Sequence, residues 1–342
     1  MTPPFSIDAF IDEALSRSLD EHDRRLWSAI REQATGGKRF RPGLLLSMYQ
    51  ALDGTDQQAA SAAADAVELL HVSFLIHDDV IDGDHVRRGR PNVSGVFSAE
   101  ARRSGAPEQK GQAYGEAAAI LAGDLALAGA MRGFALCGAS GPALVRILDL
   151  VDEVLHRSAA GELADVRVSF AGAELDDILD IAAWKTSAYS FELPLQAAAI
   201  LAEADDATIE RLGRTGRAIG ISFQLMDDLY GVFGSAEETG KDPLSDLREG
   251  KFTGLLAIAR GTAQWDELVR LVGTPDLTGA EAARARALLV ESGARDSVAA
   301  LAQEFRRTAL HEASSLPAAA ASVVREAIGK VLPHQRQAEI VA

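Results

Sequence analysis

The sequence predicts an all-α protein, and three features lead to this prediction. Apolar residues recur at intervals of three and four over long stretches, which is the spacing of one face of a helix. Alanine-rich runs such as 59–66 favour helix, whereas the alternating β-branched runs that mark strands are scarce. Glycine-containing turns, among them Gly36-Gly37 and Asp53-Gly54, separate the stretches. Because no repeat and no linker interrupts the chain, we expect residues 1–342 to form a single domain.

The helical spacing covers most of the chain in sequence order. Two polar, charged segments interrupt it, at 88–111 and 234–252, and we expect both to be long loops. Long loops in compact domains are often functional, so both deserve attention as parts of a site. The expected helical segments are 59–84, 113–138, 141–160, 191–203, 206–233 and 278–332.

Composition excludes several classes of function. The 342 residues carry 34 basic and 50 acidic side chains, a net charge of −16, which argues against a nucleic-acid binder. A single cysteine, Cys137, excludes an intrachain disulfide and a thiolate zinc cluster, so a reducing cytoplasm is the expected setting. The N-terminal residues lack the apolar core of a signal peptide, and no uncharged apolar stretch reaches the length of a membrane span.

The lysines are few, and their positions are informative. Only six of the 34 basic residues are lysines, so arginine is used wherever a general positive charge suffices. A compact ammonium and a planar guanidinium are not interchangeable where several oxygens surround the cation. Four of the six lie in motifs that suit an anion: Lys38, Lys185, Lys241 and Lys251.

The first aspartate motif ends the apolar segment 59–84. Asp78 and Asp82 are four residues apart, so both carboxylates project from one face of the helix. Without a cation they would repel each other, and Mg²⁺ suits such hard oxygen ligands. The alternative interpretation is an ordinary solvated end of a helix. Arg87 and Arg88 follow, and paired arginines beside paired carboxylates favour a site for metal and phosphate together.

Two further motifs have the same character. Upstream, the segment 36–42 (GGKRFRP) places Lys38 and Arg41 after two glycines and just before a helix, which suits an anion. Downstream, Asp227-Asp228 ends the apolar segment 206–233 and leads toward Lys241 and Lys251.

Other aspartate pairs are better explained as starts of helices. The segment 176–180 (DDILD) has the complete spacing of a metal motif, but it follows Gly172. Acidic residues at the start of a helix are commonly explained by the helix dipole. Asp205-Asp206 is interpreted in the same way. We therefore prefer Asp227-Asp228 as the second metal motif.

With these motifs in order, the chain resembles the trans-isoprenyl diphosphate synthases of the polyprenyl synthetase family. The resemblance spans nearly the whole chain through GGKRFRP, HDDVIDGDHVRRGRP, KTSAY, FQLMDDLYG and GK…SDLREGK. It implies the isoprenoid synthase fold, a bundle of antiparallel helices around a deep central cavity, usually in a homodimer. It also implies that two aspartate-rich helix ends hold three Mg²⁺ ions on an allylic diphosphate.

The resemblance also implies a role for each matching residue. Asp78 and Asp82 would bind two Mg²⁺ ions with support from Asp79, and Asp227 of the Asp227-Asp228 pair would bind the third. The allylic diphosphate would be bound by Arg87, Lys185 and Lys241, with Lys251 nearby. Isopentenyl diphosphate would be bound by Lys38, Arg41, His71 and Arg88, and the reacting carbons would be lined by Thr186, Tyr189 and Gln224.

Some positions depart from the family pattern. Gly231 replaces the last aspartate of the second motif, and we expect activity to survive because the third Mg²⁺ relies mainly on Asp227. The segment 92–115 contains an expected loop insertion of open role. Asn92 replaces a common threonine, and Glu162 replaces a frequent glutamine.

The implied activity is condensation of isopentenyl diphosphate with dimethylallyl, geranyl or farnesyl diphosphate. Chain length would depend on Ser73 and Phe74, which precede Asp78 by about one turn. A small residue followed by an aromatic one predicts geranylgeranyl diphosphate as the main product, with farnesyl or longer-chain products as alternatives. It is also possible that Phe74 is ordinary core and that other residues limit the chain.

Two other kinds of protein were weighed. A class I terpene cyclase would carry an Asn/Ser/Glu metal triad on the second helix, where this chain has Asp227-Asp228. A non-catalytic regulatory subunit of a heteromeric synthase would have lost an aspartate motif or the basic residues, and this chain keeps both.

Overall fold

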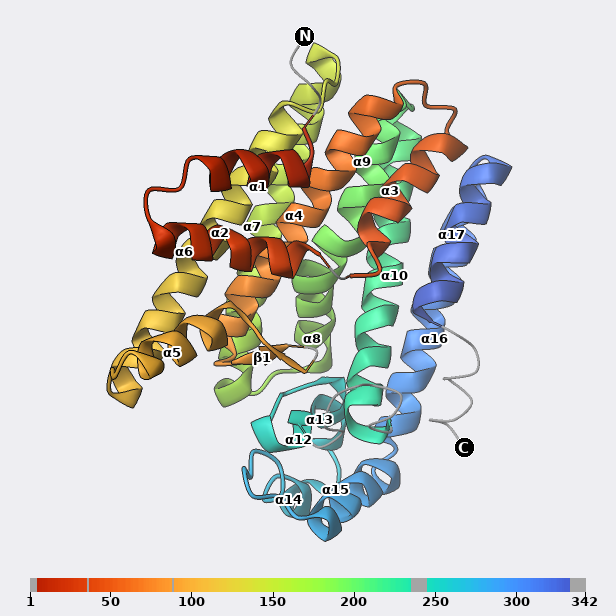
Figure 1. Ribbon diagram of the computed structural model, residues 1–342. Helices are drawn as coiled ribbons and strands as arrows, with labels where there is room; N and C mark the ends of the chain where they lie inside the picture. Colours follow the sequence, from red (N-terminus) through yellow and green to blue (C-terminus); the bar gives the residue numbers. More distant parts are fainter. Residues whose placement is uncertain (1–4, 36, 88, 235–244, 333–342) are drawn as a thin grey trace. The chain divides into compact units, whose positions relative to one another are not determined.

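The computed structural model is helical almost throughout, which confirms the predicted all-α class (Figure 1). It describes residues 5–35, 37–87, 89–234 and 245–332, except for the side chains at 245 and 246. The described chain divides into two compact units. Unit 1 comprises residues 1–149 and 197–204, and unit 2 comprises residues 150–196 and 205–342.

Unit 1 is built around a long central helix, α4, which packs against α3 and α6. Asp56 begins α4 by accepting hydrogen bonds from the backbone N–H groups of Gln58 and Ala59. A short antiparallel hairpin, β1–β2, follows the end of α4. In chain order the elements are α1 (Ile7–Ser16), α2 (Glu21–Ala34), α3 (Phe40–Ala51), α4 (Gln57–Ile81), β1 (Val86–Arg87), β2 (Arg90–Pro91), α5 (Val93–Arg103), α6 (Glu108–Ala135) and the start of α7 (Gly141–Ala171).

Glycines let α6 approach its neighbours closely. A Cβ at Gly123 would lie 2.2 Å from Nε2 of His77 on α4, and one at Gly129 would lie 2.7 Å from Leu69. Larger side chains at these positions would push α6 away from α4 and open the core. By length and composition α4 and α6 could span a membrane, but 72% of the apolar window of α4 is buried inside the protein, as expected of a core helix.

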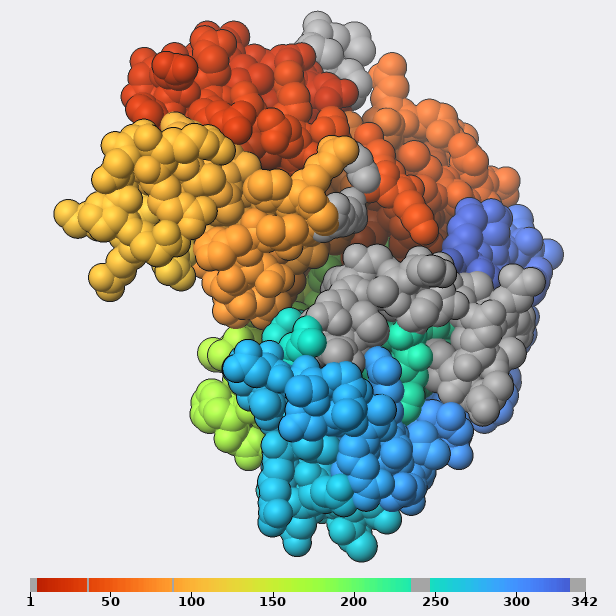
Figure 2. Space-filling view, turned by 60° about the horizontal axis from the view of Figure 1, so that its bottom comes forward, coloured from red at the N-terminus to blue at the C-terminus, as the bar shows by residue number. Residues whose placement is uncertain are grey.

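The prediction of a loop at 88–111 is wrong, because α5 and the start of α6 together occupy most of this segment. Asn92 begins this helix by accepting a hydrogen bond from Gly95, and Phe97 is buried beneath it. Gly115 of α6 lies so close that a Cβ there would meet the Ser98 hydroxyl at 2.1 Å. The helix therefore has a buried face that the overall polar composition of the segment did not reveal. Figure 2 shows α5 and the start of α6 on the surface of this unit, beside the α1–α2 pair.

Unit 2 is built around α10, which packs against η1 and α16. The segment 278–332, which we expected to be one helical stretch, contains three helices. Figure 2 shows α12 to α15 together in one region of the surface. Besides the rest of α7, the elements are α8 (Leu175–Ile181), η1 (Ala182–Glu192), the start of α9 (Leu193–Leu201, of which the residues from 197 belong to unit 1), α10 (Asp206–Phe233), α12 (Ser245–Glu249), α13 (Gly254–Ala259), α14 (Trp265–Leu268), α15 (Gly279–Glu291), α16 (Ala294–Ala313) and α17 (Ala318–Val331).

Glycines in α7 and α10 allow these two helices to pack closely against the π-helix η1. A Cβ at Gly161 of α7 would lie 2.5 Å from the backbone nitrogen of Lys185. On the other side, a Cβ at Gly216 of α10 would lie 2.8 Å from the backbone of Glu192, and Gly220 similarly touches Ser187. Arg157 of α7 also donates two hydrogen bonds to Glu192, at 2.8 and 2.9 Å. The backbone of η1 is therefore fixed from both sides.

Candidate active site

One face of α4 is accessible although most of this helix is buried. His71, Phe74 and Asp78 are each partly exposed, and Asp82, the C-cap residue, is exposed. Ser73, on another face, is completely buried. Residues three, four and seven positions apart share a helix face, so the four accessible side chains form one stripe that ends in the two carboxylates.

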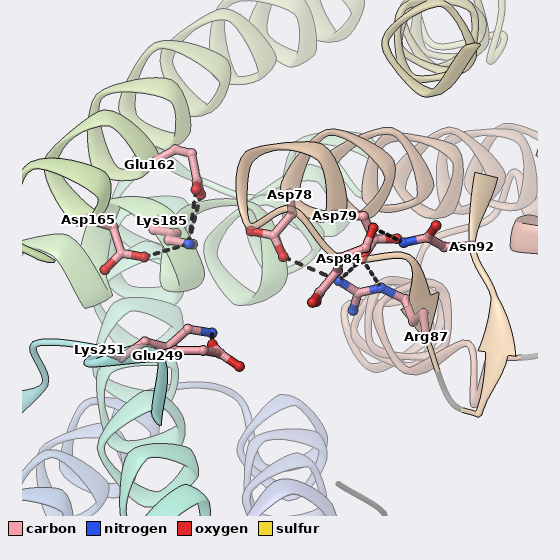
Figure 3. A network of polar contacts seen from close by, with 10 residues as sticks. All are labelled: Asp78, Asp79, Asp84, Arg87, Asn92, Glu162, Asp165, Lys185, Glu249 and Lys251. Atoms are coloured by element: carbon pink, nitrogen blue, oxygen red, sulfur yellow. Dashed lines mark hydrogen bonds and ion pairs between the residues drawn. The ribbon is translucent and has the colours of Figure 1, made fainter. Parts of the chain in front are cut away.

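The second aspartate of this motif is buried and bound to an arginine (Figure 3). Arg87, on β1, donates to Oδ1 of Asp79 from Nε at 2.7 Å and reaches Oδ2 of Asp78 at 3.4 Å. Burial raises the pKa of the Asp79 carboxyl, and the hydrogen bond and charge of Arg87 offset part of that effect. Burial would lower the pKa of Arg87, but the hydrogen bond to Asp79 and the negative charges of Asp79, Asp78 and Asp84 together outweigh burial and raise this pKa. Asp79 thus anchors the guanidinium beside Asp78.

Asn92 connects the segment after α4 to the start of α5 through hydrogen bonds, a role that we did not predict from the sequence. Its Nδ2 donates to the carbonyl of Asp84 at 2.7 Å, and its Oδ1 caps α5 by accepting from Gly95 at 2.9 Å. The backbone N–H of Asp84 in turn donates to the carbonyl of Asp79 at 2.8 Å. A signal was available, because this is the only asparagine in the chain and it directly precedes an apolar segment.

We expect Asn92→Ala to lower the free energy of unfolding by about 1–3 kcal/mol, because it removes a cap of α5 and the hydrogen bond to the Asp84 carbonyl. Urea unfolding measures this change. Asn92→Ser is the matched control, since it keeps a capping oxygen and lacks only the Nδ2 donor, and it should lose less. Equal losses for both variants would show that the cap contributes nothing.

The residues before α3 supply cations to unit 1. Lys38 is exposed, and Arg41 lies partly buried in the first turn of α3. Between them, Arg39 adopts a left-handed conformation, with φ of 44°, and forms an ion pair with Asp65 of α4. This ion pair ties the start of α3 to α4 less than two turns before His71. Arg88, predicted to bind isopentenyl diphosphate, lies outside the described residues.

Three candidate residues of unit 2 lie on η1. Lys185, Thr186 and Tyr189 are partly exposed, and π-helical segments are frequent at functional sites. The Thr186 hydroxyl donates to Oε1 of Gln224 at 2.7 Å, and Nε2 of Gln224 donates to Oδ1 of Asp228 at 2.8 Å. This chain of hydrogen bonds connects η1 to the end of α10 and orients the Gln224 side chain.

The aspartates of α10 repeat the pattern seen at the end of α4. Asp227 is exposed, whereas Asp228 is 8% exposed and hydrogen-bonded to Gln224. In both motifs, then, the first carboxylate is accessible and the second is buried and anchors a neighbouring polar side chain. A pair of carboxylates at the end of an apolar helix is stable in this arrangement because the buried carboxylate of the pair is hydrogen-bonded to a polar side chain.

The cations predicted to bind the allylic diphosphate in unit 2 differ in their surroundings. The Lys185 ammonium lies 2.9 Å from Oε2 of Glu162 and 2.6 Å from Oδ2 of Asp165, contacts that the sequence interpretation missed (Figure 3). Lys251, just before α13, is exposed and lies 3.3 Å from the Glu249 carboxylate. Lys241 lies outside the described residues.

The two aspartate pairs that we excluded do serve helix starts. Asp177 completes a capping box with Glu174 at the start of α8, accepting from the Glu174 N–H at 3.1 Å. Asp205 is the N-cap of α10 and accepts from the Thr208 N–H at 2.7 Å. Hydrogen bonds from the Thr208 hydroxyl and from the Thr208 backbone N–H lower the pKa of the Asp205 carboxyl.

The two residues predicted to control chain length lie in different environments. Phe74 belongs to the accessible face of α4 and is therefore not fully buried core. Ser73 lies between α4 and α6, where its hydroxyl donates to the carbonyl of Gly123 at 2.9 Å. A large side chain at position 73 would therefore push against α6.

The accessible carboxylates fit Mg²⁺ that binds together with a phosphorylated substrate. Among the described residues, no group of three or more histidine, cysteine or acidic side chains could hold a metal ion by itself. Mg²⁺ needs no such cage, because it takes one or two protein carboxylates and completes its shell with water and phosphate oxygens. Asp78, Asp82 and Asp227 supply carboxylates of this kind. Carboxylates with a cation beside them, as at Asp78 with Arg87, suit an enzyme that handles diphosphates through a divalent ion.

Comparison with known proteins identifies the family. The model of the polyprenyl synthetase family matches residues 24–287. The chain is 32% identical to the geranylfarnesyl diphosphate synthase of Aeropyrum pernix over 91% of its length and 93% of that protein. It is 35% identical to a (2E,6E)-farnesyl diphosphate synthase of Mycobacterium bovis, over 69% of this chain and 62% of that one. The chain therefore belongs to the polyprenyl synthetase family of prenyltransferases.

A solved structure agrees with this assignment. The geranylgeranyl pyrophosphate synthase of Corynebacterium glutamicum, complexed with isoprenyl diphosphate and magnesium, superposes with a TM-score of 0.86. The two chains are 28% identical, and the match covers 95% of this chain and 96% of that one. The three named proteins differ in product length, so family membership establishes a prenyl diphosphate synthase without specifying its product.

Proposed function

We propose that this protein condenses isopentenyl diphosphate with dimethylallyl, geranyl or farnesyl diphosphate, and that its main product is geranylgeranyl diphosphate. The observation that carries the proposal is the shared design of the two aspartate motifs. Asp78 and Asp227 are accessible for a metal–diphosphate complex, whereas Asp79 and Asp228 are buried and hold Arg87 and Gln224.

The proposed ligands of the two substrates are the cationic and polar residues that the sequence motifs supply. The isopentenyl diphosphate is bound by the cations at the start of α3, with His71 and Arg88. The allylic diphosphate is bound by Arg87, Lys185, Lys241 and Lys251. Mg²⁺, three ions in our proposal, is held through Asp78, Asp82 and Asp227, and when bound it neutralises the diphosphate and so makes it a better leaving group.

Side chains of the protein then stabilise the charges that develop during the reaction. Arg87 and Lys185 stabilise the charge that builds up on the departing diphosphate as the allylic C–O bond breaks. Thr186 and Gln224, held by their mutual hydrogen bond, present oxygens to the allylic cation. The isopentenyl double bond attacks this cation to form the new C–C bond, and the departed diphosphate accepts the proton that is then lost. Water must be excluded, because it would quench the cation.

The product length follows from the accessible face of α4. We propose that the growing chain runs along this face past Phe74, one turn from Asp78, and that the ring limits elongation after geranylgeranyl diphosphate. The partial exposure of Phe74 supports this role over that of a core residue.

We further propose a cytoplasmic homodimer. The single cysteine is buried, which suits a reducing compartment. Size-exclusion chromatography with light scattering tests the dimer.

The activity is tested by incubating the purified chain alone with Mg²⁺, isopentenyl diphosphate and each of the three allylic diphosphates in turn. We expect geranylgeranyl diphosphate as the main product in chromatography, and no product when EDTA removes the metal. Farnesyl or longer products would correct the chain length only. No product from any allylic substrate would overturn the proposal and favour a subunit that requires a partner.

A further inference from the structure

The Lys185 ammonium is paired with two carboxylates, those of Glu162 and Asp165. Its Nζ lies 3.1 Å from Oε1 and 2.9 Å from Oε2 of Glu162, and 2.6 Å from Oδ2 of Asp165 (Figure 3). The two carboxylates are three residues apart on α7 and therefore share one face of that helix. All three side chains are partly buried, with exposed fractions of 25% for Lys185, 20% for Glu162 and 42% for Asp165.

The backbone fixes this arrangement. Gly161, directly before Glu162, lies against the backbone of η1. A Cβ at Gly161 would lie 2.5 Å from the backbone nitrogen of Lys185 and 2.9 Å from the Cβ of Trp184. The two helices therefore touch at the position where the acidic pair faces the lysine. Side-chain movement alone cannot take Glu162 far from the Lys185 backbone.

The acidic pair opposes the binding that Lys185 is proposed to perform. Two carboxylates and one ammonium sum to a charge of −1, and partial burial weakens screening by solvent and salt. An incoming diphosphate thus meets a cation that is already neutralised. A glutamine at position 162, frequent in the family, would keep an acceptor oxygen for the ammonium without the negative charge.

We propose that Glu162 is a positioning residue that acts through Lys185 to weaken binding of the allylic diphosphate, while Asp165 keeps the ammonium in place. The inference rests on the proposed function, because it assumes that Lys185 binds the diphosphate of the allylic substrate. Its consequence is that allylic substrate and released diphosphate are held less tightly than they would be with glutamine at position 162.

Glu162→Gln tests the proposal. We expect the KM for the allylic diphosphate to fall about three- to tenfold, because one partly buried carboxylate no longer competes with the diphosphate for the Lys185 ammonium. The KM for isopentenyl diphosphate should stay nearly constant. Asp152→Asn, an identical charge change at an exposed position of α7, is the matched control and should change neither KM. An unchanged or higher allylic KM in Glu162→Gln would overturn the proposal.

Replacement of Lys185 as well shows whether Glu162 changes diphosphate binding through this lysine. The affinity for inorganic diphosphate with Mg²⁺ is measured by calorimetry in four proteins: the unsubstituted chain, Glu162→Gln, Lys185→Gln and the double variant. Glu162→Gln should tighten binding in the first background and have no effect once Lys185 is replaced. Tightening in both backgrounds would mean that Glu162 acts directly on the ligand and would contradict the positioning role. Because this readout needs no turnover, it separates failure of this inference from failure of the proposed activity.

Discussion

Asp78→Ala is expected to reduce Mg²⁺-dependent turnover by about a thousandfold or more, because it removes an accessible carboxylate that we propose binds the metal–diphosphate complex. Asp227→Ala should have an effect of similar size through the second motif. The measurement is incorporation of labelled isopentenyl diphosphate into extended product, at saturating substrate and over a range of Mg²⁺ concentrations. Both variants should remain folded, because neither side chain is buried.

Asp176→Ala is the control for these variants. Asp176 is exposed and belongs to the segment with complete metal-motif spacing that we exclude from the site. It should leave turnover unchanged. Turnover close to that of the unsubstituted chain in Asp78→Ala or Asp227→Ala would remove the metal assignments, and a large loss in Asp176→Ala would reinstate the segment 176–180.

Phe74→Ala is expected to lengthen the main product by at least one isopentenyl unit. The ring lies on the accessible face of α4 one turn before Asp78, so its removal opens the path of the growing chain. Product lengths are read by chromatography against prenyl standards after dephosphorylation. Phe170→Ala is the control, because that ring is 79% exposed on α7, and it should leave the product distribution unchanged.

The companion change, Ser73→Phe, is predicted from the sequence to shorten the products. The structure makes this variant harder to interpret, because Ser73 is buried against α6 and donates to the carbonyl of Gly123. A phenyl ring there costs about 1–3 kcal/mol or more through overpacking, so thermal unfolding must accompany the assay. Unchanged product lengths in both Phe74→Ala and a folded Ser73→Phe would contradict the proposed control of chain length.

The long, strongly periodic helices were predictable from the sequence alone. The segment 206–233 coincides with α10, and 59–84 agrees with α4 to within three residues at either end. The same periodicity failed at 88–111, where α5 buries only a few small and aromatic residues, and at 278–332, where turns separate three helices. Local spacing identifies a helix best when one wide face is apolar.

The candidate site was also largely visible in the sequence, because its chemistry depends on residue types at short spacing. Asp78 with Asp82 is a local pattern that a helix converts directly into neighbouring carboxylates, and Asp227-Asp228 marks the end of a second apolar helix. The scarcity of lysine separately indicated Lys38, Lys185 and Lys251 as candidate ligands.

Only the tertiary structure could show which member of each pair is accessible and what the other members bind. Burial of Asp79 and Asp228, the tether from Asn92 to Asp84, and the acidic pair around Lys185 all join residues through packing. Their partners come from other turns or other helices, and their distances depend on close approaches such as that of Gly161 to η1. The sequence by itself therefore determined the fold class, the family resemblance and the candidate ligands. The packing of helices decided which of these ligands are accessible and which are held by other side chains, because burial depends on contacts between distant parts of the chain.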